Sequence, residues 1–165
     1  GWSVSLIVTN AGAINLDLEC RIAPEVLGER DGVTLEDNGN LAARSASGSA
    51  RFDAYIVCPA SGTTIGKIAA GISDNLATRS ALVALKERRK LILVPRETPV
   101  STPHLEAMAR MSSWGVVIFP ASPGFYNSPE DIGDLVDFVV ARILDQMDID
   151  HSLGRRWTGD EISRD

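Results

Sequence analysis

Three apolar segments of the sequence reach a proline and then open into polar loops that could carry chemistry. The junctions are Cys58-Pro59, Val94-Pro95 and Phe119-Pro120. Proline lacks a backbone N–H, so each segment is expected to stop pairing there. The loops, residues 60–64, 96–99 and 121–127, contain hydroxyls, an Arg–Glu pair and a tyrosine. Since ligands of open parallel sheets bind beyond the carboxyl ends of the strands, these loops are expected to line a site.

The first loop leads directly into a predicted helix and has the composition of an anion site. Ser61 and Thr64 supply hydroxyls, and Gly62 allows a close approach. Hydroxyls and backbone N–H groups at a helix start can hold a phosphate. They can equally do no more than cap the helix, and the spacing matches neither a P-loop nor a dinucleotide motif. Both interpretations remain open.

Cations occur beside apolar helical positions. Arg79 and Lys86 share a helical face with Leu82 and Val83, and Arg142 lies at the edge of a later apolar stripe. A charge on an apolar face is costly to bury unless an anion meets it, which points to an anion-binding pocket. Alternatively, such side chains extend to water.

A carboxylate at the second strand end could act as an acid or base. Glu97 follows Arg96 there, and an exposed ion pair is the other interpretation. His104 and His151 are isolated, so no catalytic triad can be argued from spacing. No cluster of metal ligands is apparent in the sequence.

The elements that would position these residues alternate between strand and helix. Strands are predicted at Val4–Thr9, Ala54–Cys58, Leu91–Val94 and Val116–Phe119, with a short one at Val33–Glu36. Helices are predicted at Thr64–Ile72, Leu76–Arg88 and Pro103–Ser113, followed by a long one ending at Met147 that Ser128 caps and Pro129 begins. This order predicts an α/β fold: a three-layer, doubly wound, flavodoxin-like parallel sheet with helices on both faces. We expect one domain over residues 1–147 and a tail over 148–165 that packs over a site.

Composition excludes several classes of protein. The chain of 165 residues has a formal net charge of −6, which argues against nucleic-acid binding. No segment is apolar enough to span a membrane, and no signal peptide is recognisable, so a cytoplasmic protein is expected.

Motifs along nearly the whole chain resemble the flavin prenyltransferase family. They are Ser47-Gly48-Ser49, Tyr55–Ser61, residues 71–76, residues 85–90, Val94–Pro99, His104-Leu105-Glu106, Phe125-Tyr126-Asn127 and Arg155-Arg156-Trp157. The Pro-Arg-Glu-Thr-Pro segment, with Phe-Tyr and a terminal Arg-Arg-Trp, is the most specific combination. The resemblance implies a flavodoxin-like enzyme that uses reduced FMN and no metal.

In that family, a dimethylallyl group passes from dimethylallyl phosphate to N5 and C6 of reduced FMN. The prenylated FMN then serves a partner decarboxylase of the UbiD type. The resemblance assigns the substrate phosphate to Lys86, Arg96, Tyr126 and Arg142. It assigns proton transfers to Glu97 and Glu19, and the flavin site to Thr9, Ser61, Thr64, Arg79 and Trp157. It also implies a homododecamer with sites between subunits.

Two departures and two alternatives accompany this resemblance. The family's first strand and its Gly-Ala-Ser-Gly turn have no counterpart before Gly1, so we expect either that an N-terminal segment is missing from this chain or that the protein is a divergent relative. The first loop also differs from that of many relatives. The alternatives are an FMN-dependent cysteine-type decarboxylase and a flavin-binding redox or carrier protein without chemistry on the flavin. The cysteine-type decarboxylases carry a Pro-x-Met-Asn segment and an essential histidine, whereas residues 120–126 here read differently and neither histidine lies in a suitable place. The cations and Glu97 together favour transfer chemistry over a carrier.

Overall fold

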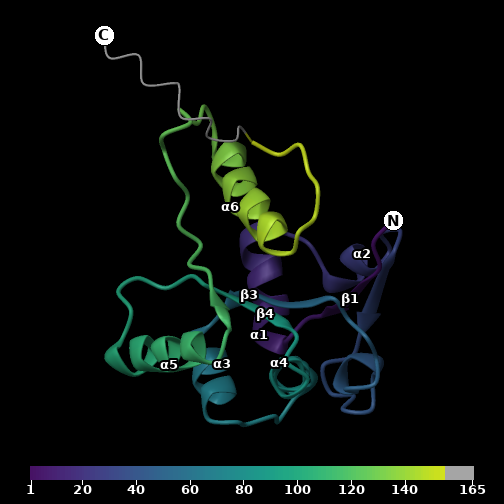
Figure 1. Cartoon of the computed structure of the whole chain (residues 1–165). Coiled ribbons are helices and arrows are strands. Elements are labelled where there is room, and N and C mark those ends of the chain that lie inside the picture. Colours follow the sequence, from purple (N-terminus) through teal and green to yellow (C-terminus); the bar gives the residue numbers. More distant parts are fainter. Residues whose placement is uncertain (155–165) are drawn as a thin grey trace. The chain divides into compact units, whose positions relative to one another are not determined.

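The strands anticipated from the apolar segments are present, and all their pairings are parallel. In the computed structural model, which describes residues 1–154, they form two sheets (Figure 1). One sheet pairs β1 with β2, and the other has the order β3-β4-β5. The bounds are β1 (Val4–Ile7), β2 (Val33–Glu36), β3 (Ala54–Ala60), β4 (Lys90–Pro95) and β5 (Val117–Ile118). Parallel strands joined by helices confirm the predicted α/β fold class.

Proline does not end the second predicted strand at Cys58. β3 continues through Pro59 to Ala60, and β4 includes Pro95. The pairing between β3 and β4 is regular up to Val57 and shifts before Ala60. The ladder is therefore irregular where Pro59 has no N–H to donate, but it resumes one residue later. The polar loops consequently start at Ser61 and Arg96.

The predicted helices are present within a few residues of their expected ends. They are α3 (Gly62–Ala69), α4 (Leu76–Lys86), α5 (Thr102–Ser113) and α6 (Ile132–Gln146). The structure adds short helical segments that the sequence did not indicate: α1 (Asn10–Asn15), the π-helical turn η1 (Leu16–Cys20), α2 (Pro24–Gly28) and the 3₁₀ turn η2 (Arg44–Ala46). Segments as short as α2 and η2 cannot display a periodic apolar face. α1 continues directly into η1, where the π-helical turn departs from the 3.6-residue repeat.

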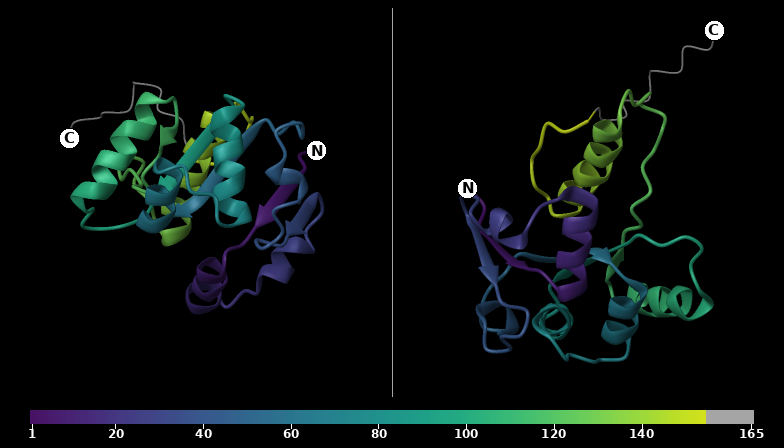
Figure 2. Two further views of the ribbon diagram at one scale, coloured as in Figure 1. Left: turned by 90° about the horizontal axis from the view of Figure 1, so that it is seen from below. Right: turned by 180° about the vertical axis from the view of Figure 1, so that it is seen from behind.

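A hydrophobic core packs strand β4 against helices α3, α4 and α5, the last two through Ala84 and Met111. Leu91 and Leu93 of β4 are fully buried against Ile65 and Ile68 of α3 and Met111 of α5. Each such side chain stabilises the fold by roughly 1.5–3 kcal/mol. Helices α3 and α5 lie side by side in the views of Figures 1 and 2. The loops that follow β3 and β4 therefore start from a rigid block.

The long helix α6 begins later than the sequence predicted. Ser128 was expected to cap it, but Ser128 has a left-handed backbone (φ 51°), and the N-cap is Asp131. The Asp131 carboxylate accepts a hydrogen bond from the N–H of Asp134 at 3.0 Å, which satisfies one free donor of the first turn. Asp131 therefore caps the helix, rather than Ser128 with Pro129 in the first turn.

The chain divides after Phe119 into two compact units, residues 1–119 and residues 120–165. The strands lie in the first unit and α6 in the second. One domain over residues 1–147 with a tail over 148–165 stays a prediction. Trp157 lies outside the described residues. Within residues 1–154, each helix is too short or too polar to cross a bilayer.

Candidate active site

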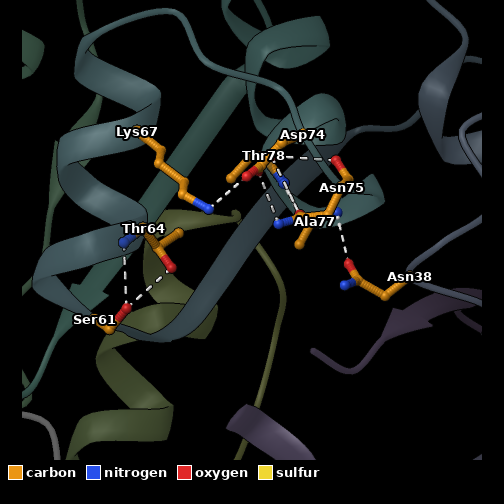
Figure 3. Close-up of polar contacts among 8 residues, drawn as sticks. All are labelled: Asn38, Ser61, Thr64, Lys67, Asp74, Asn75, Ala77 and Thr78. Carbon is orange, nitrogen blue, oxygen red and sulfur yellow. Dashed lines mark hydrogen bonds and ion pairs between the residues drawn. The ribbon is translucent and has the colours of Figure 1, made fainter. Parts of the chain in front are cut away.

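Hydroxyl-bearing residues cap two helices directly after strands. Thr9 follows β1, and its Oγ1 accepts a hydrogen bond from the N–H of Gly12 at 3.0 Å. Ser61 follows β3, and its Oγ accepts from the N–H of Thr64 at 3.2 Å (Figure 3). The hydroxyls of Ser61 and Thr64 also lie 3.0 Å apart, so one hydroxyl hydrogen of this pair is left to donate. The capping interpretation is confirmed, and a free donor remains at the helix start.

The turn before α4 is held by a network centred on Asp74 and Asn75 (Figure 3). Asn75 Oδ1 accepts from the N–H of Thr78 at 2.9 Å and caps the helix. Lys67 of α3 donates to Asp74 at 2.6 Å, and this hydrogen bond holds the pKa of Asp74 below its ordinary value. Helices α3 and α4 are thereby tied at their facing ends. Arg79 lies one turn into α4, with its side chain exposed.

Three of the predicted site residues make contacts near the end of β4. Arg96 Nη2 lies 3.4 Å from Glu19 Oε1, although 77 positions separate them in sequence. Both side chains are exposed. Glu97, the next residue, extends toward α5, where its Oε2 lies 3.4 Å from His104 Nδ1. Arg96 therefore pairs with Glu19, and Glu97 pairs with His104, in two separate contacts.

His104 was not assigned a role by the sequence, yet its ring occupies a restricted position. Its Nδ1 is buried, lies 3.4 Å from Glu97 Oε2 and has no aligned hydrogen-bond partner among the described residues. A Cβ on Gly62 would collide with the imidazole ring. Gly62 is therefore needed to accommodate His104, in addition to starting α3. Its contact with Glu97 joins helix α5 to the loop after β4, and the spacing of the two residues in the sequence does not reveal that contact.

Lys86 lies apart from these charges. Its ammonium pairs with Glu87, and the hydrogen bond lowers the pKa of Glu87. The Lys86 side chain is exposed, in agreement with the water-facing interpretation. Arg89 has a structural role in the same basic run, because it donates to the carbonyl oxygens of Gly48 and Ala50 at 2.6 and 2.5 Å.

The second unit contains a pocket of about 840 Å³ that brings Tyr126 and Arg142 together. Phe138 of α6 also lines it, and the rings of Tyr126 and Phe138 meet edge to face at 5.7 Å. Arg142 Nη1 donates to Asp145 Oδ2 at 2.6 Å. Two of the four predicted phosphate ligands thus share one cavity, although they are 16 positions apart.

Acidic side chains also line this pocket: Glu130, Asp134, Asp137 and Asp145. Asp134 accepts from the N–H of Glu130, and Asp145 from Arg142, so two of them are engaged within the unit. With this surplus of carboxylates, Arg142 alone provides a weak site for a phosphate dianion. Further cations, such as Lys86 and Arg96, would be needed to hold one.

The residues present suit a flavin mononucleotide. Free hydroxyl donors and helix starts after β1 and β3 are groups that bind phosphate and ribityl oxygens. Cys58 does not have the properties of a nucleophile, because partial desolvation raises the pKa of its thiol. Cys58 is also exposed, although it lies in an apolar segment. Residues 1–154 contain no group of three or more His, Cys, Asp or Glu side chains placed to hold a metal ion.

Known proteins similar to this chain are flavoproteins. The family model described as "Flavoprotein" matches residues 1–144. The flavin prenyltransferase UbiX of Halalkalibacterium halodurans is 42% identical over 166 residues, covering 95% of this chain and 81% of the relative. The corresponding enzyme of Thermoplasma acidophilum is 52% identical over 121 residues, covering 73% of this chain and 67% of the relative.

Solved structures agree with this relationship. A dodecameric, FMN-dependent UbiX-like decarboxylase from Escherichia coli O157:H7 is 42% identical and superimposes with a TM-score of 0.91, covering 95% of this chain and 84% of that one. AnUbiX (PadA1), in complex with FMN and dimethylallyl pyrophosphate, is 38% identical with a TM-score of 0.90, covering 94% and 82%. This chain therefore belongs to the flavoprotein family and, within it, to the UbiX flavin prenyltransferases.

Proposed function

We propose that this protein is a flavin prenyltransferase that uses reduced FMN as the acceptor and dimethylallyl phosphate as the donor. The observation that carries the proposal is the 42% identity to a UbiX flavin prenyltransferase across 95% of the chain. In the proposed reaction the allylic C–O bond of the donor breaks, phosphate leaves, and new bonds form to N5 and C6 of reduced FMN.

The cations have the clearest task in this reaction. A phosphate monoester leaves only when its developing charge is stabilised, and fixed cations supply that stabilisation. We assign this role to Lys86, Arg96 and Arg142, with Tyr126 donating its hydroxyl. The shared pocket of Tyr126 and Arg142 supports half of this set. Departure of phosphate leaves an allylic cation, which must be kept from water.

We assign the proton transfers of the reaction to Glu97 and Glu19. Closing a ring at C6 requires a proton to leave that carbon and another to be taken up by the prenyl chain. A carboxylate beside Arg96 and a carboxylate beside His104 are suitable acceptors and donors. Glu19 lies 3.4 Å from Arg96, and Glu97 lies 3.4 Å from His104. These contacts at the end of β4 support the assignment of both acids.

We assign flavin binding to Thr9, Ser61, Thr64, Arg79 and Trp157. The hydroxyl donors at the starts of α1 and α3 support the first three. Arg79 lies on the exposed side of α4, where it can meet an anionic ligand. Trp157 is proposed from the resemblance alone.

The assembly, location and use of the product complete the proposal. A homododecamer with sites between subunits would allow Lys86 and Arg96 to meet Tyr126 and Arg142 from a neighbouring copy. The dodecameric relative from Escherichia coli O157:H7 supports this assembly. We place the protein in the cytoplasm, as one domain over residues 1–147 with the tail closing over the site, and propose that a decarboxylase of the UbiD type receives the prenylated FMN.

Anaerobic incubation with photoreduced FMN and dimethylallyl phosphate tests the reaction. We expect the donor to be consumed and a flavin heavier by one isoprene unit to appear, as measured by mass spectrometry and the absorption spectrum. Dimethylallyl pyrophosphate, run in parallel, tests whether a diphosphate also serves. Unchanged FMN with both donors would contradict the proposal and favour a cysteine-type decarboxylase or a flavin carrier.

A further inference from the structure

The carboxylate of Asp145 lies where a helix does not favour it. Asp145 is in the last turn of α6, which ends at Gln146. The C-terminal end of a helix carries partial negative charge, so an acidic side chain is destabilising there. Only 17% of the Asp145 side chain is exposed, which adds a cost of desolvation. A charge in this position requires compensation by nearby donors.

Each oxygen of Asp145 accepts from a different side chain. Arg142 Nη1 donates to Oδ2 at 2.6 Å. His151 Nε2 lies 3.2 Å from Oδ1, and the His151 side chain is only 7% exposed. The carboxylate therefore joins α6 to the segment that follows it.

The hydrogen-bond partners of His151 define its tautomer. The backbone N–H of Leu153 donates to His151 Nδ1 at 3.2 Å, so Nδ1 acts as the acceptor. The ring hydrogen of the neutral imidazole is then on Nε2, which donates to Asp145. The result is a directed chain from Leu153 through His151 to Asp145, where Arg142 donates from the other side.

This series of hydrogen bonds restrains the side chain of Arg142, which would otherwise be mobile. The Arg142 guanidinium is half-exposed and lines the pocket together with Tyr126. Its bond to Asp145 occupies one of five N–H donors and leaves others for a phosphate. Fixing a long side chain before the ligand arrives reduces the entropy lost on binding.

We propose that Asp145 and His151 are positioning residues that orient Arg142 for the phosphate of dimethylallyl phosphate. This inference rests on the proposed function. It assigns no contact with substrate to Asp145 or His151. Their effect should reach the donor through Arg142, and flavin binding should be unaffected.

The first test is Asp145→Asn in the full chain. Asparagine replaces one of the two accepting oxygens with an NH2 donor, so it cannot reproduce the contacts of Oδ1 and Oδ2 with both His151 and Arg142. We expect the Kd of dimethylallyl phosphate, measured by calorimetry with unreactive oxidised FMN present, to rise about tenfold. The KM of the donor should rise in parallel and kcat should fall, because Arg142 also stabilises the leaving phosphate, whereas the KM of FMN should stay close to wild type. Unchanged donor affinity would overturn the proposal.

Two replacements of His151 distinguish its contact with Asp145, which positions Arg142, from its contact with Leu153, which shapes the loop after α6. In His151→Gln the amide can still reach and donate to Asp145, so we expect donor affinity within about threefold of wild type. In His151→Asn the shorter amide can still accept from Leu153 but cannot reach Asp145, so we expect about the tenfold loss of Asp145→Asn. The reverse order, with Asn restoring and Gln failing, would show a loop role only and overturn the proposal.

A double-mutant cycle with Arg142→Ala completes the test. If Asp145 acts through Arg142, Asp145→Asn should weaken donor binding no further in the Arg142→Ala background. A full additional loss would sink the inference while leaving the proposed function intact. If the wild-type protein neither binds nor consumes the donor, the proposed function fails, and the positioning role fails with it.

Discussion

Adjacent residues at the end of β4 have different partners. Arg96 extends to Glu19, whereas Glu97 extends to His104 of α5. The adjacent Arg96 and Glu97 therefore take part in two separate contacts rather than in one ion pair with each other.

Replacing Glu97 with glutamine should impair turnover without releasing the flavin. The amide keeps the shape of the carboxylate but cannot accept a proton, so kcat should fall by roughly 10²–10⁴-fold. Single-turnover kinetics measure the loss, and a flavin-binding titration measures the Kd of FMN, which should stay unchanged. Glu106→Gln, at an exposed position of α5, is the matched control and should behave as wild type. Full activity of Glu97→Gln would remove Glu97 from the reaction.

At the scale of the element, α3 contains two glycines in opposite environments. Gly62 is the first residue of the helix, and a Cβ there would collide with the ring of His104. Gly66, one turn later, has no atom within 4 Å of the position that a Cβ would occupy. The same substitution should therefore have opposite effects at the two positions.

Gly62→Ala should lower the free energy of unfolding by about 1–3 kcal/mol, because the added methyl group must displace a packed ring. Gly66→Ala should raise it by about 0.5–1 kcal/mol, because alanine is the better helix former and meets no obstacle. Urea unfolding measures both. In a His104→Ala background the penalty of Gly62→Ala should disappear, and a persisting penalty would show that His104 is not its cause.

In helix α6 the residues that are buried differ from those that the apolar spacing of the sequence predicts to be buried. Its apolar residues repeat at helical spacing and predict a single continuous stripe. In the structure Ile143 is buried, whereas Ile132 and Val136 are 78% and 54% exposed. One edge of the stripe is therefore left uncovered in the chain.

At the scale of the whole molecule, exposed apolar residues of this kind mark surfaces that associate. Ile132, Val136 and Val140 lie on one edge of α6, and Phe125 and Tyr126 precede the helix with their rings exposed. A homododecamer would cover such a surface. The exposed side chains therefore support the proposed assembly independently of the relatives.

Val136→Glu should break the assembly into smaller species, because a buried, unpaired carboxylate at an interface is strongly destabilising. Sedimentation velocity measures the change in mass, and donor affinity should fall with it if sites form between subunits. Ser112→Glu adds the same charge at an exposed position of α5 and serves as the control. An intact dodecamer in Val136→Glu would exclude this edge of α6 from the interface.

The sequence alone determined the α/β class, the order of strands and helices, and the loops to inspect. These properties depend on local periodicity and on the residues at strand ends, which can be read from a linear sequence. The resemblance added the site residues, since motifs keep their spacing along the chain. Helix α2 was missed because it is too short to be periodic, and the stretch of α1 and η1 was missed because its π-helical turn departs from the regular helical repeat.

Tertiary structure decided which side chains meet. The contacts of Glu19 with Arg96, of Glu97 with His104, and of His151 with Asp145 join separate loops and helices. It also decided that Asp131 caps α6 and that one edge of the apolar stripe stays exposed. Local sequence sets the type of each element, whereas contacts depend on how the elements pack, and packing is a property of the whole fold.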